Sequence, residues 1–214
     1  MAHPLLALVA APPDHDAPFR TPSLSRHAAR DDNADVAALG ADIVARIRAG
    51  DARAFESVVR EYFTPLARFV FGFVQSYEDA EDVVQEVLCR VWERRDAWAP
   101  GAGVRAYLFA AARNRALNLR AHELVVSRTR VAVRDAFGEP PFESADADEE
   151  LQESLRRLRL ATDALSERQR LALHLRYEQG LTVPEVAHVL EISPRPTERL
   201  LARALDALRG ALTR

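Results

Sequence analysis

A tyrosine, two asparagines and several arginines recur at helical spacing in the middle of the chain, a combination that suits unpaired nucleic acid. Tyr107, Asn114 and Asn118 are spaced by seven and four residues, which places them on one stripe of a helix. Unpaired bases stack on aromatic rings for about 1–3 kcal/mol each, and amides read exposed base edges. Arg113 and Arg120 flank the stripe, where they can hold phosphates. A core tyrosine with solvated polar neighbours is the alternative for the same pattern.

Upstream of that stripe, residues 79–93 predict an amphipathic helix with a mostly acidic outer face. Its apolar residues recur at the three-and-four spacing that gathers them on one side: Ala80, Val83, Val84, Val87, Leu88, Val91 and Trp92. The opposite face holds Asp79, Asp82, Glu86, Arg90 and Glu93. Acids at the start of a helix and arginines at its end suit the helix dipole. Both a solvated surface helix and a protein-binding ridge are compatible with this pattern.

The C-terminal part predicts two short helices joined by a tight turn. Ser166 with Gln169, and Thr182 with Glu185, have the spacing of capping boxes that start helices. Ser193 is placed to cap a final helix. The second helix of a helix-turn-helix enters the major groove with its N-terminal residues at the base edges. The candidate readers are therefore Arg195, Thr197 and Arg199, with Arg203 as a phosphate contact. An ordinary helical hairpin is the alternative.

The remaining segments must hold these helices, and they predict an all-α fold. Only eight glycines and few strand-forming runs occur in the 214 residues. A helix that starts near Asp35 is expected to end at Gly50, and Asp51 to cap a second helix. Pro65 is expected in the first turn of a third helix. Two more helical patterns cover residues 104–120 and 151–165.

Charge is segregated along the chain although the net charge is only −3. Residues 105–134 hold seven arginines and one acid, whereas residues 139–153 hold seven acids and no base. The expected organisation is a disordered tail (1–33), a helical domain (34–122), a flexible acidic linker (123–150) and a second helical domain (151–214). A solvated tether is the simplest interpretation of the linker.

Several functional classes are disfavoured by the same composition. Cys89 is the single cysteine, which excludes a disulfide framework, and the six histidines show no spacing for a metal site or for a nucleophile and its base. We therefore expect no catalytic residue, no metal and no cofactor. No apolar run is long enough to span a bilayer, and Leu5–Ala11 lacks the preceding basic residues of a signal peptide, so the cytoplasm is the default location.

Three sequence motifs together resemble one family. Asp79-Ala-Glu-Asp-Val-Val-Gln-Glu-Val87 followed by Arg90-Val-Trp92 looks like region 2.2 of bacterial sigma factors. The stretch from Gly103-Val-Arg-Ala-Tyr107 to Asn118 resembles regions 2.3 and 2.4. Leu165-Ser-Glu-Arg-Gln-Arg170, with Glu185-Val-Ala and Ile192-Ser-Pro-Arg195, resembles region 4. Their order and spacing are similar to those of the extracytoplasmic-function (ECF) sigma factors of the sigma-70 family.

This resemblance implies two small helical domains, core RNA polymerase and promoter DNA as partners, and no membrane insertion. An anti-sigma factor is a further partner that it allows. The implied polymerase-binding residues are Asp79, Asp82, Gln85, Glu86, Arg90 and Trp92. The implied −10 residues are Trp98, Arg105, Tyr107, Arg113, Asn114, Asn118 and Arg120, and the implied −35 residues are Arg195, Thr197, Arg199 and Arg203. In the family the acidic linker threads the RNA channel of the polymerase.

Two points qualify the resemblance. Glu191 stands where the family has a turn glycine, so the backbone there must avoid the left-handed region or accept strain of about 1–2 kcal/mol. A stand-alone helix-turn-helix regulator with an N-terminal dimerisation domain is the alternative function. Such a regulator would bind duplex DNA specifically without polymerase, whereas a sigma factor would need the core enzyme.

Overall fold

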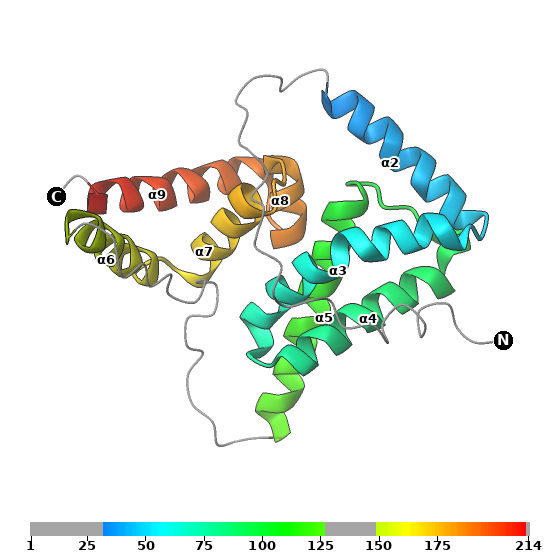
Figure 1. The fold of residues 1–214 in the computed structure, drawn as a ribbon, viewed down its shortest axis with the longest axis horizontal. Coiled ribbons are helices and arrows are strands. Elements are labelled where there is room, and N and C mark those ends of the chain that lie inside the picture. Colours follow the sequence, from blue (N-terminus) through cyan, green and yellow to red (C-terminus); the bar gives the residue numbers. More distant parts are fainter. Residues whose placement is uncertain (1–31, 127–148, 213–214) are drawn as a thin grey trace. The chain divides into compact units, whose positions relative to one another are not determined.

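The computed structural model describes residues 32–126 and 149–212, and every regular element in these two stretches is a helix. The helices run in order from α2 (blue) to α9 (red) in Figure 1. Their bounds are α2 (Asp32–Arg48), α3 (Ala52–Val74), α4 (Tyr77–Glu93), η1 (Arg95–Ala97), α5 (Val104–Val126), α6 (Glu149–Asp163), α7 (Glu167–Leu173), η2 (His174–Glu178), α8 (Val183–Leu190) and α9 (Pro194–Leu212). The predicted all-α fold class is confirmed. The expected tail and linker lie almost entirely outside the described residues.

The chain forms two compact units. The first unit combines the described chain up to Val59 with Leu88–Ala99, so it contains α2, the start of α3, the end of α4 and η1. Ile47, Phe55 and Val91 are buried in it. Burial of such side chains contributes about 1.5–3 kcal/mol each, which is why these short helical pieces are stable together.

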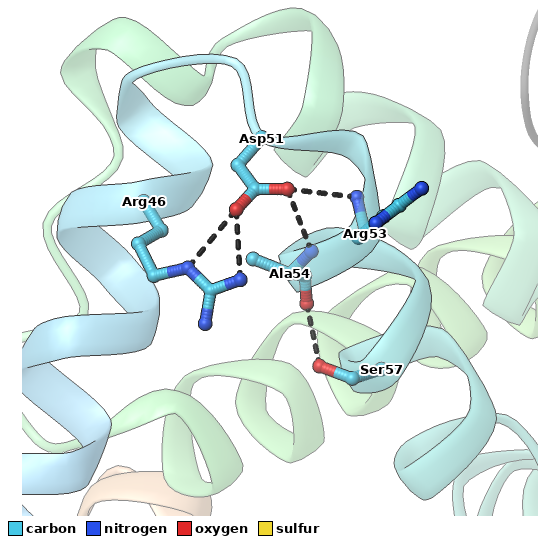
Figure 2. A network of polar contacts seen from close by, with 5 residues as sticks. All are labelled: Arg46, Asp51, Arg53, Ala54 and Ser57. Carbon is cyan, nitrogen blue, oxygen red and sulfur yellow. Dashed lines mark hydrogen bonds and ion pairs between the residues drawn. The ribbon is translucent and has the colours of Figure 1, made fainter.

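The turn between α2 and α3 is fixed by Asp51 (Figure 2). Its Oδ1 accepts hydrogen bonds from the backbone N–H groups of Arg53 and Ala54, at 2.9 and 3.1 Å, which caps α3. Its Oδ2 accepts from Nε and Nη2 of Arg46, at 3.0 and 2.8 Å. Gly50, with φ +84°, ends α2 in the left-handed region. Both sequence predictions for this turn are confirmed.

The prediction of a separate helix starting at Pro65 is wrong, because α3 continues from Ala52 to Val74 with Pro65 inside it. Proline removes one backbone hydrogen bond from a helix and normally kinks or ends it. Here Leu66, Phe69 and Val70, directly after the proline, are completely buried. Their burial is the favourable term that offsets the lost hydrogen bond.

The second unit comprises Arg60–Val87 and Pro100–Arg214. In its α3–α5 portion, the ring of Phe69 meets the rings of Phe73 and Phe109 edge-on, with centroids 5.3 and 5.0 Å apart. Edge-on aromatic pairs add about 0.5–1.5 kcal/mol beyond the area they bury. The contact between Phe69 and Phe109 joins α3 to α5 and so fixes the helix that carries Tyr107, Asn114 and Asn118.

In the α6–α9 portion of this unit, both predicted capping boxes are present. The Ser166 N–H donates to Gln169 Oε1 at 3.0 Å, and the Gln169 N–H donates to Ser166 Oγ at 3.3 Å. The Thr182 N–H donates to Glu185 Oε2 at 2.7 Å, and the Glu185 N–H donates to Thr182 Oγ1 at 3.4 Å. The helices α7 and α8 therefore begin where the sequence predicted.

The helix that starts at α7 ends shortly before Gly180, and its last turn is wider than an α-helix. Residues 174–178 form a π turn, in which the Gln179 N–H donates to the His174 carbonyl at 3.0 Å. Single π turns of this kind are uncommon. No periodicity in the sequence signals this one.

The turn between α8 and α9 adopts the left-handed conformation at Glu191. This residue has φ 55° and ψ 43°, and its N–H donates to the His188 carbonyl at 3.2 Å. The sequence left open whether the backbone at Glu191 avoids the left-handed region or adopts it with strain, and the structure shows that it adopts it. The turn is thereby as tight as the one that glycine allows, and α9 follows α8 in a helix-turn-helix.

Candidate nucleic-acid and protein interfaces

The helix α4 presents its acidic residues as predicted. Ser76 Oγ accepts a hydrogen bond from the Asp79 N–H at 3.2 Å, which caps the helix start. The apolar face is buried at Ala80, Val83, Val84, Val87, Leu88 and Val91. On the other side Asp82 and Arg90 are exposed, while Asp79, Gln85 and Glu86 are half-buried. A partner surface can therefore reach the polar ridge along this helix.

The Glu86 side chain of α4 forms an ion pair with Arg115 of α5. Nε of Arg115 donates to Oε2 of Glu86, and about a third of each side chain is exposed (32% for Arg115 and 31% for Glu86). Helical spacing assigned Arg115 no role, because it places this residue close to the apolar side of its helix. The only signal that could have found the pair is the presence of opposite charges on two helices expected to pack together.

Trp92, at the end of α4, is half-buried in the first unit. Its ring lies against Phe55, with the centroids 5.0 Å apart, and the Arg95 guanidinium carbon lies 4.7 Å from its centroid. These contacts cover part of the indole. Trp92 therefore belongs as much to the local packing as to the outer ridge.

Trp98 follows η1 and is only 4% exposed. Its backbone N–H donates to the Arg95 carbonyl at 3.0 Å, which closes the 3₁₀ turn. With its ring covered, Trp98 is not presented for stacking on a base in this conformation. It instead anchors the loop that leads to Gly103, where φ of +90° allows the chain to enter α5.

The predicted stripe of α5 lies on a single continuous helix. Asn114 and Asn118 are exposed, and Tyr107, Arg113 and Arg120 are half-buried, as is Arg105. Nη1 of Arg113 donates to Oδ1 of Asn114 at 3.3 Å, which brings a guanidinium and an amide side by side. The side of α5 that packs inward holds Ala106, Leu108, Phe109, Ala112 and Ala116, all buried. The helix thus separates a packed face from a polar one.

The recognition-helix candidate α9 exposes Arg195, Arg199 and Arg203. Their four-residue spacing places them on one side of the helix. Thr197 is different: it is fully buried, and its Oγ1 donates to the Ser193 carbonyl at 3.1 Å. Its hydroxyl stabilises the first turn of α9, so in this conformation the outward surface is carried by the three arginines.

Three or more metal-binding side chains (His, Cys, Asp or Glu) do not gather anywhere in the two described stretches. Cys89 is half-buried on α4. Across those same stretches, no helix combines the length and apolar character needed to cross a membrane.

Comparisons with known proteins agree on both portions of the chain. The model of Sigma-70 region 2 matches residues 58–123, and the model of Sigma-70 region 4 matches residues 161–210. The ECF RNA polymerase sigma factor SigL of Mycobacterium tuberculosis is 30% identical over 168 residues, covering 77% of this chain and 92% of SigL. The ECF RNA polymerase sigma-E factor of Escherichia coli K12 is 29% identical over 177 residues, covering 78% and 90%.

Two solved structures share the fold. CnrH, in complex with the cytosolic domain of CnrY, matches with a TM-score of 0.54 at 24% identity, over 80% of this chain and 95% of CnrH. The sigma factor RpoE of Bartonella quintana, in complex with the anti-sigma factor NepR, matches with a TM-score of 0.54 at 22% identity, over 76% and 98%. At this level of identity the likeness shows the fold.

Proposed function

The chain belongs to the ECF RNA polymerase sigma factors, and from that premise we propose which partner each of its surfaces binds during promoter-specific initiation. The helix α4 binds core RNA polymerase, α9 reads the −35 element, and α5 captures the opened −10 element. The observation that carries this proposal is that one chain exposes an acidic ridge on α4, amides on α5 and an arginine row on α9.

The polymerase surface consists of Asp79, Asp82, Gln85, Glu86, Arg90 and Trp92. Asp82 and Arg90 are its most accessible members, because both are exposed on the face opposite the buried residues. Exposed charges of this kind set association rate and specificity. Trp92 lies at the end of the helix and contributes a partly covered apolar edge.

The −10 surface combines Arg105, Tyr107, Arg113, Asn114, Asn118 and Arg120, with Trp98 as the anchor of its entry loop. Flipping a base out of the duplex costs a few kcal/mol. Stacking on an aromatic side chain stabilises each flipped base by about 1–3 kcal/mol, and arginines add phosphate contacts. Opening is thus driven by binding of the unstacked strand, and the chain makes or breaks no covalent bond.

The −35 surface is the row formed by Arg195, Arg199 and Arg203 on α9. Arginines near the start of a recognition helix reach guanine edges, and those further along hold the backbone. The stand-alone regulator is not favoured, because residues 58–123 match a sigma region and not a dimerisation domain. The chain would act in the cytoplasm with the polymerase, and an anti-sigma factor is a candidate regulator, as in the B. quintana complex.

A paired substitution tests the polymerase surface. Asp82→Arg combined with Gln85→Ala is expected to abolish co-purification with core RNA polymerase and promoter-specific transcription in vitro, because it reverses the accessible charge of α4. Circular dichroism should show an unchanged helical signal, since Asp82 is exposed. Asp42→Arg, at an exposed acid of α2, is the matched control and should bind like the wild type. Unchanged association of the double variant would remove α4 from the interface.

A further inference from the structure

The ion pair between Glu86 and Arg115 is a link between the two helices that carry different parts of the proposed function. Glu86 lies four residues after Asp82 and four before Arg90, so it belongs to the polar ridge of α4. Arg115 lies directly after Asn114 and three residues before Asn118, on the helix that holds the −10 stripe. The pair therefore joins the polymerase surface to the −10 surface through one side-chain contact.

The surroundings of Arg115 indicate that this contact is specific. Ala112 and Ala116, one turn before Arg115 and directly after it, are fully buried against the rest of the unit. About a third of the Arg115 side chain is exposed, so the guanidinium is partly withdrawn from water, and the Glu86 carboxylate accepts a charge-assisted hydrogen bond from its Nε. Pairs that are partly withdrawn from water are also screened less by salt than fully exposed ones. Arg115 thus has one well-defined partner and one preferred orientation.

We propose that Arg115 is a positioning residue, which holds α5 in a fixed position relative to the Glu86 side chain of α4. When α4 binds polymerase, the −10 stripe of α5 is thereby placed on the melted strand. The inference rests on the proposed function. Arg115 touches neither DNA nor polymerase in this role. Its loss should therefore slow promoter opening without weakening assembly of the holoenzyme.

The test measures two quantities separately. Affinity for core RNA polymerase is measured by titration, and the rate of promoter opening is measured with preassembled holoenzyme at saturating concentration, on a promoter mapped with the wild-type chain. Arg115→Gln should leave the affinity for core RNA polymerase within about twofold of the wild type. It should slow promoter opening about tenfold, which corresponds to a loss of ~1.4 kcal/mol of transition-state stabilisation. Arg115→Glu, which sets two carboxylates together, should slow opening further.

Restoring the pair in reverse gives the decisive comparison. The double variant Glu86→Arg with Arg115→Glu should open the promoter faster than Glu86→Arg alone, because the ion pair is re-formed with the charges exchanged while both variants carry the same change on the polymerase surface. The matched control is the pair of Glu153 with Arg157, which lies within α6 alone and is bonded at 3.0 Å. Arg157→Gln should leave the opening rate unchanged, since that pair joins no two surfaces.

The outcomes separate this inference from the function on which it rests. If wild-type chain fails to form a holoenzyme that initiates, the proposed function itself is wrong. If the wild type initiates but Arg115→Gln opens the promoter at the wild-type rate, only the positioning role is overturned. It is also overturned if Arg115→Gln loses affinity for core in proportion to opening, or if charge exchange gives no recovery.

Discussion

Arg95 is held against Trp92 by two different contacts. Its guanidinium carbon lies 4.7 Å from the centre of the indole, and its Nη1 donates to the Trp92 carbonyl at 2.8 Å. The first contact is a cation–π interaction, and the second fixes the turn that follows α4. Because Trp98 closes the same 3₁₀ turn by bonding to the Arg95 carbonyl, Arg95 connects the end of α4 to the loop that enters α5.

Arg95→Ala is therefore expected to destabilise the first unit. A partly buried cation–π contact is worth about 1–2 kcal/mol and a hydrogen bond about 1 kcal/mol, so we expect a loss of about 1–3 kcal/mol. Urea unfolding followed by tryptophan fluorescence measures this loss. Arg94→Ala changes the exposed neighbouring arginine and should cost under about 0.5 kcal/mol. Equal effects of the two substitutions would mean that the Trp92 contact contributes nothing.

Glu191→Gly should be more stable than Glu191→Ala, because only the alanine variant keeps the backbone strain at this position. The left-handed conformation at Glu191 costs a side-chain-bearing residue about 1–2 kcal/mol, and glycine adopts it without strain. The greater conformational freedom of glycine in the unfolded chain lowers the free energy of unfolding by about 0.4–1 kcal/mol, which partly offsets this gain. Both variants lose the hydrogen bond that Asn114 Nδ2 donates to Glu191 Oε1 at 3.0 Å, so Glu191→Gly should exceed Glu191→Ala by roughly 0.5–1 kcal/mol in denaturant unfolding.

The control for that gain is the same substitution in helical backbone. Glu198→Gly, on the exposed side of α9, should destabilise by about 1 kcal/mol, because glycine is a poor helix former. If Glu191→Gly is no more stable than Glu191→Ala, the conformation of Glu191 is not strained as its dihedral angles indicate.

Thr182→Ala should weaken the start of α8. It removes the hydroxyl that accepts from the Glu185 N–H, and loss of an N-cap of this type costs about 0.5–2 kcal/mol. Thr182→Ser retains the hydroxyl and should remain close to wild type. The comparison is made by thermal unfolding. A Ser variant as unstable as the Ala variant would assign the loss to the methyl group and not to the cap.

Acid should weaken the turn between α2 and α3 through Asp51. The hydrogen bonds from the Arg46 guanidinium, followed by that from the Ala54 N–H, lower the pKa of the Asp51 carboxyl below its usual value of 3.8. A group whose pKa is lowered in the folded state stabilises the fold above its unfolded pKa, and this contribution is lost as the pH falls through the folded pKa.

The expected measurement is a pH series of unfolding midpoints. Wild type should lose stability below about pH 4 more steeply than Asp51→Asn, which has no carboxyl to protonate. Asp42→Asn, at an exposed acid on α2, should follow the wild-type curve. If the unfolding midpoints of wild type and Asp51→Asn fall equally steeply with pH, the ion pair between Asp51 and Arg46 does not contribute to the stability of the fold.

Local signals in this sequence predicted local structure well. Gly50, Asp51, Ser166 and Thr182 act on neighbouring backbone groups, so their effect is contained in a few residues. The boundary at Pro65 was wrong because burial of the residues after it, a tertiary effect, overrides the helix-breaking preference of proline. Periodicity alone does not contain that information.

The limits are similar for the functional surfaces. Helical spacing placed Arg195 and Arg199 outward correctly, but it could not show that Thr197, two residues from each, turns inward and donates to the Ser193 carbonyl one turn earlier. The pairing of Glu86 with Arg115 joins residues 29 positions apart, so it depends on how α4 and α5 pack. The part of a surface that depends on one helix is predictable, and the part that depends on two helices is not.

The contrast between Arg195 and Thr197 gives the sharpest test of the −35 surface. Arg195 is exposed at the start of α9, so Arg195→Ala should lower discrimination between the best −35 sequence and a single mismatch by about 1–3 kcal/mol, the worth of a good base contact. Thr197→Val retains the buried volume and should leave discrimination unchanged while lowering the free energy of unfolding, because it removes the bond to the Ser193 carbonyl. Competition binding of holoenzyme to matched and mismatched promoters measures both. If Arg195→Ala weakens binding to all promoters alike, that arginine contacts only phosphate. If Thr197→Val changes the preferred sequence, the threonine turns outward on DNA.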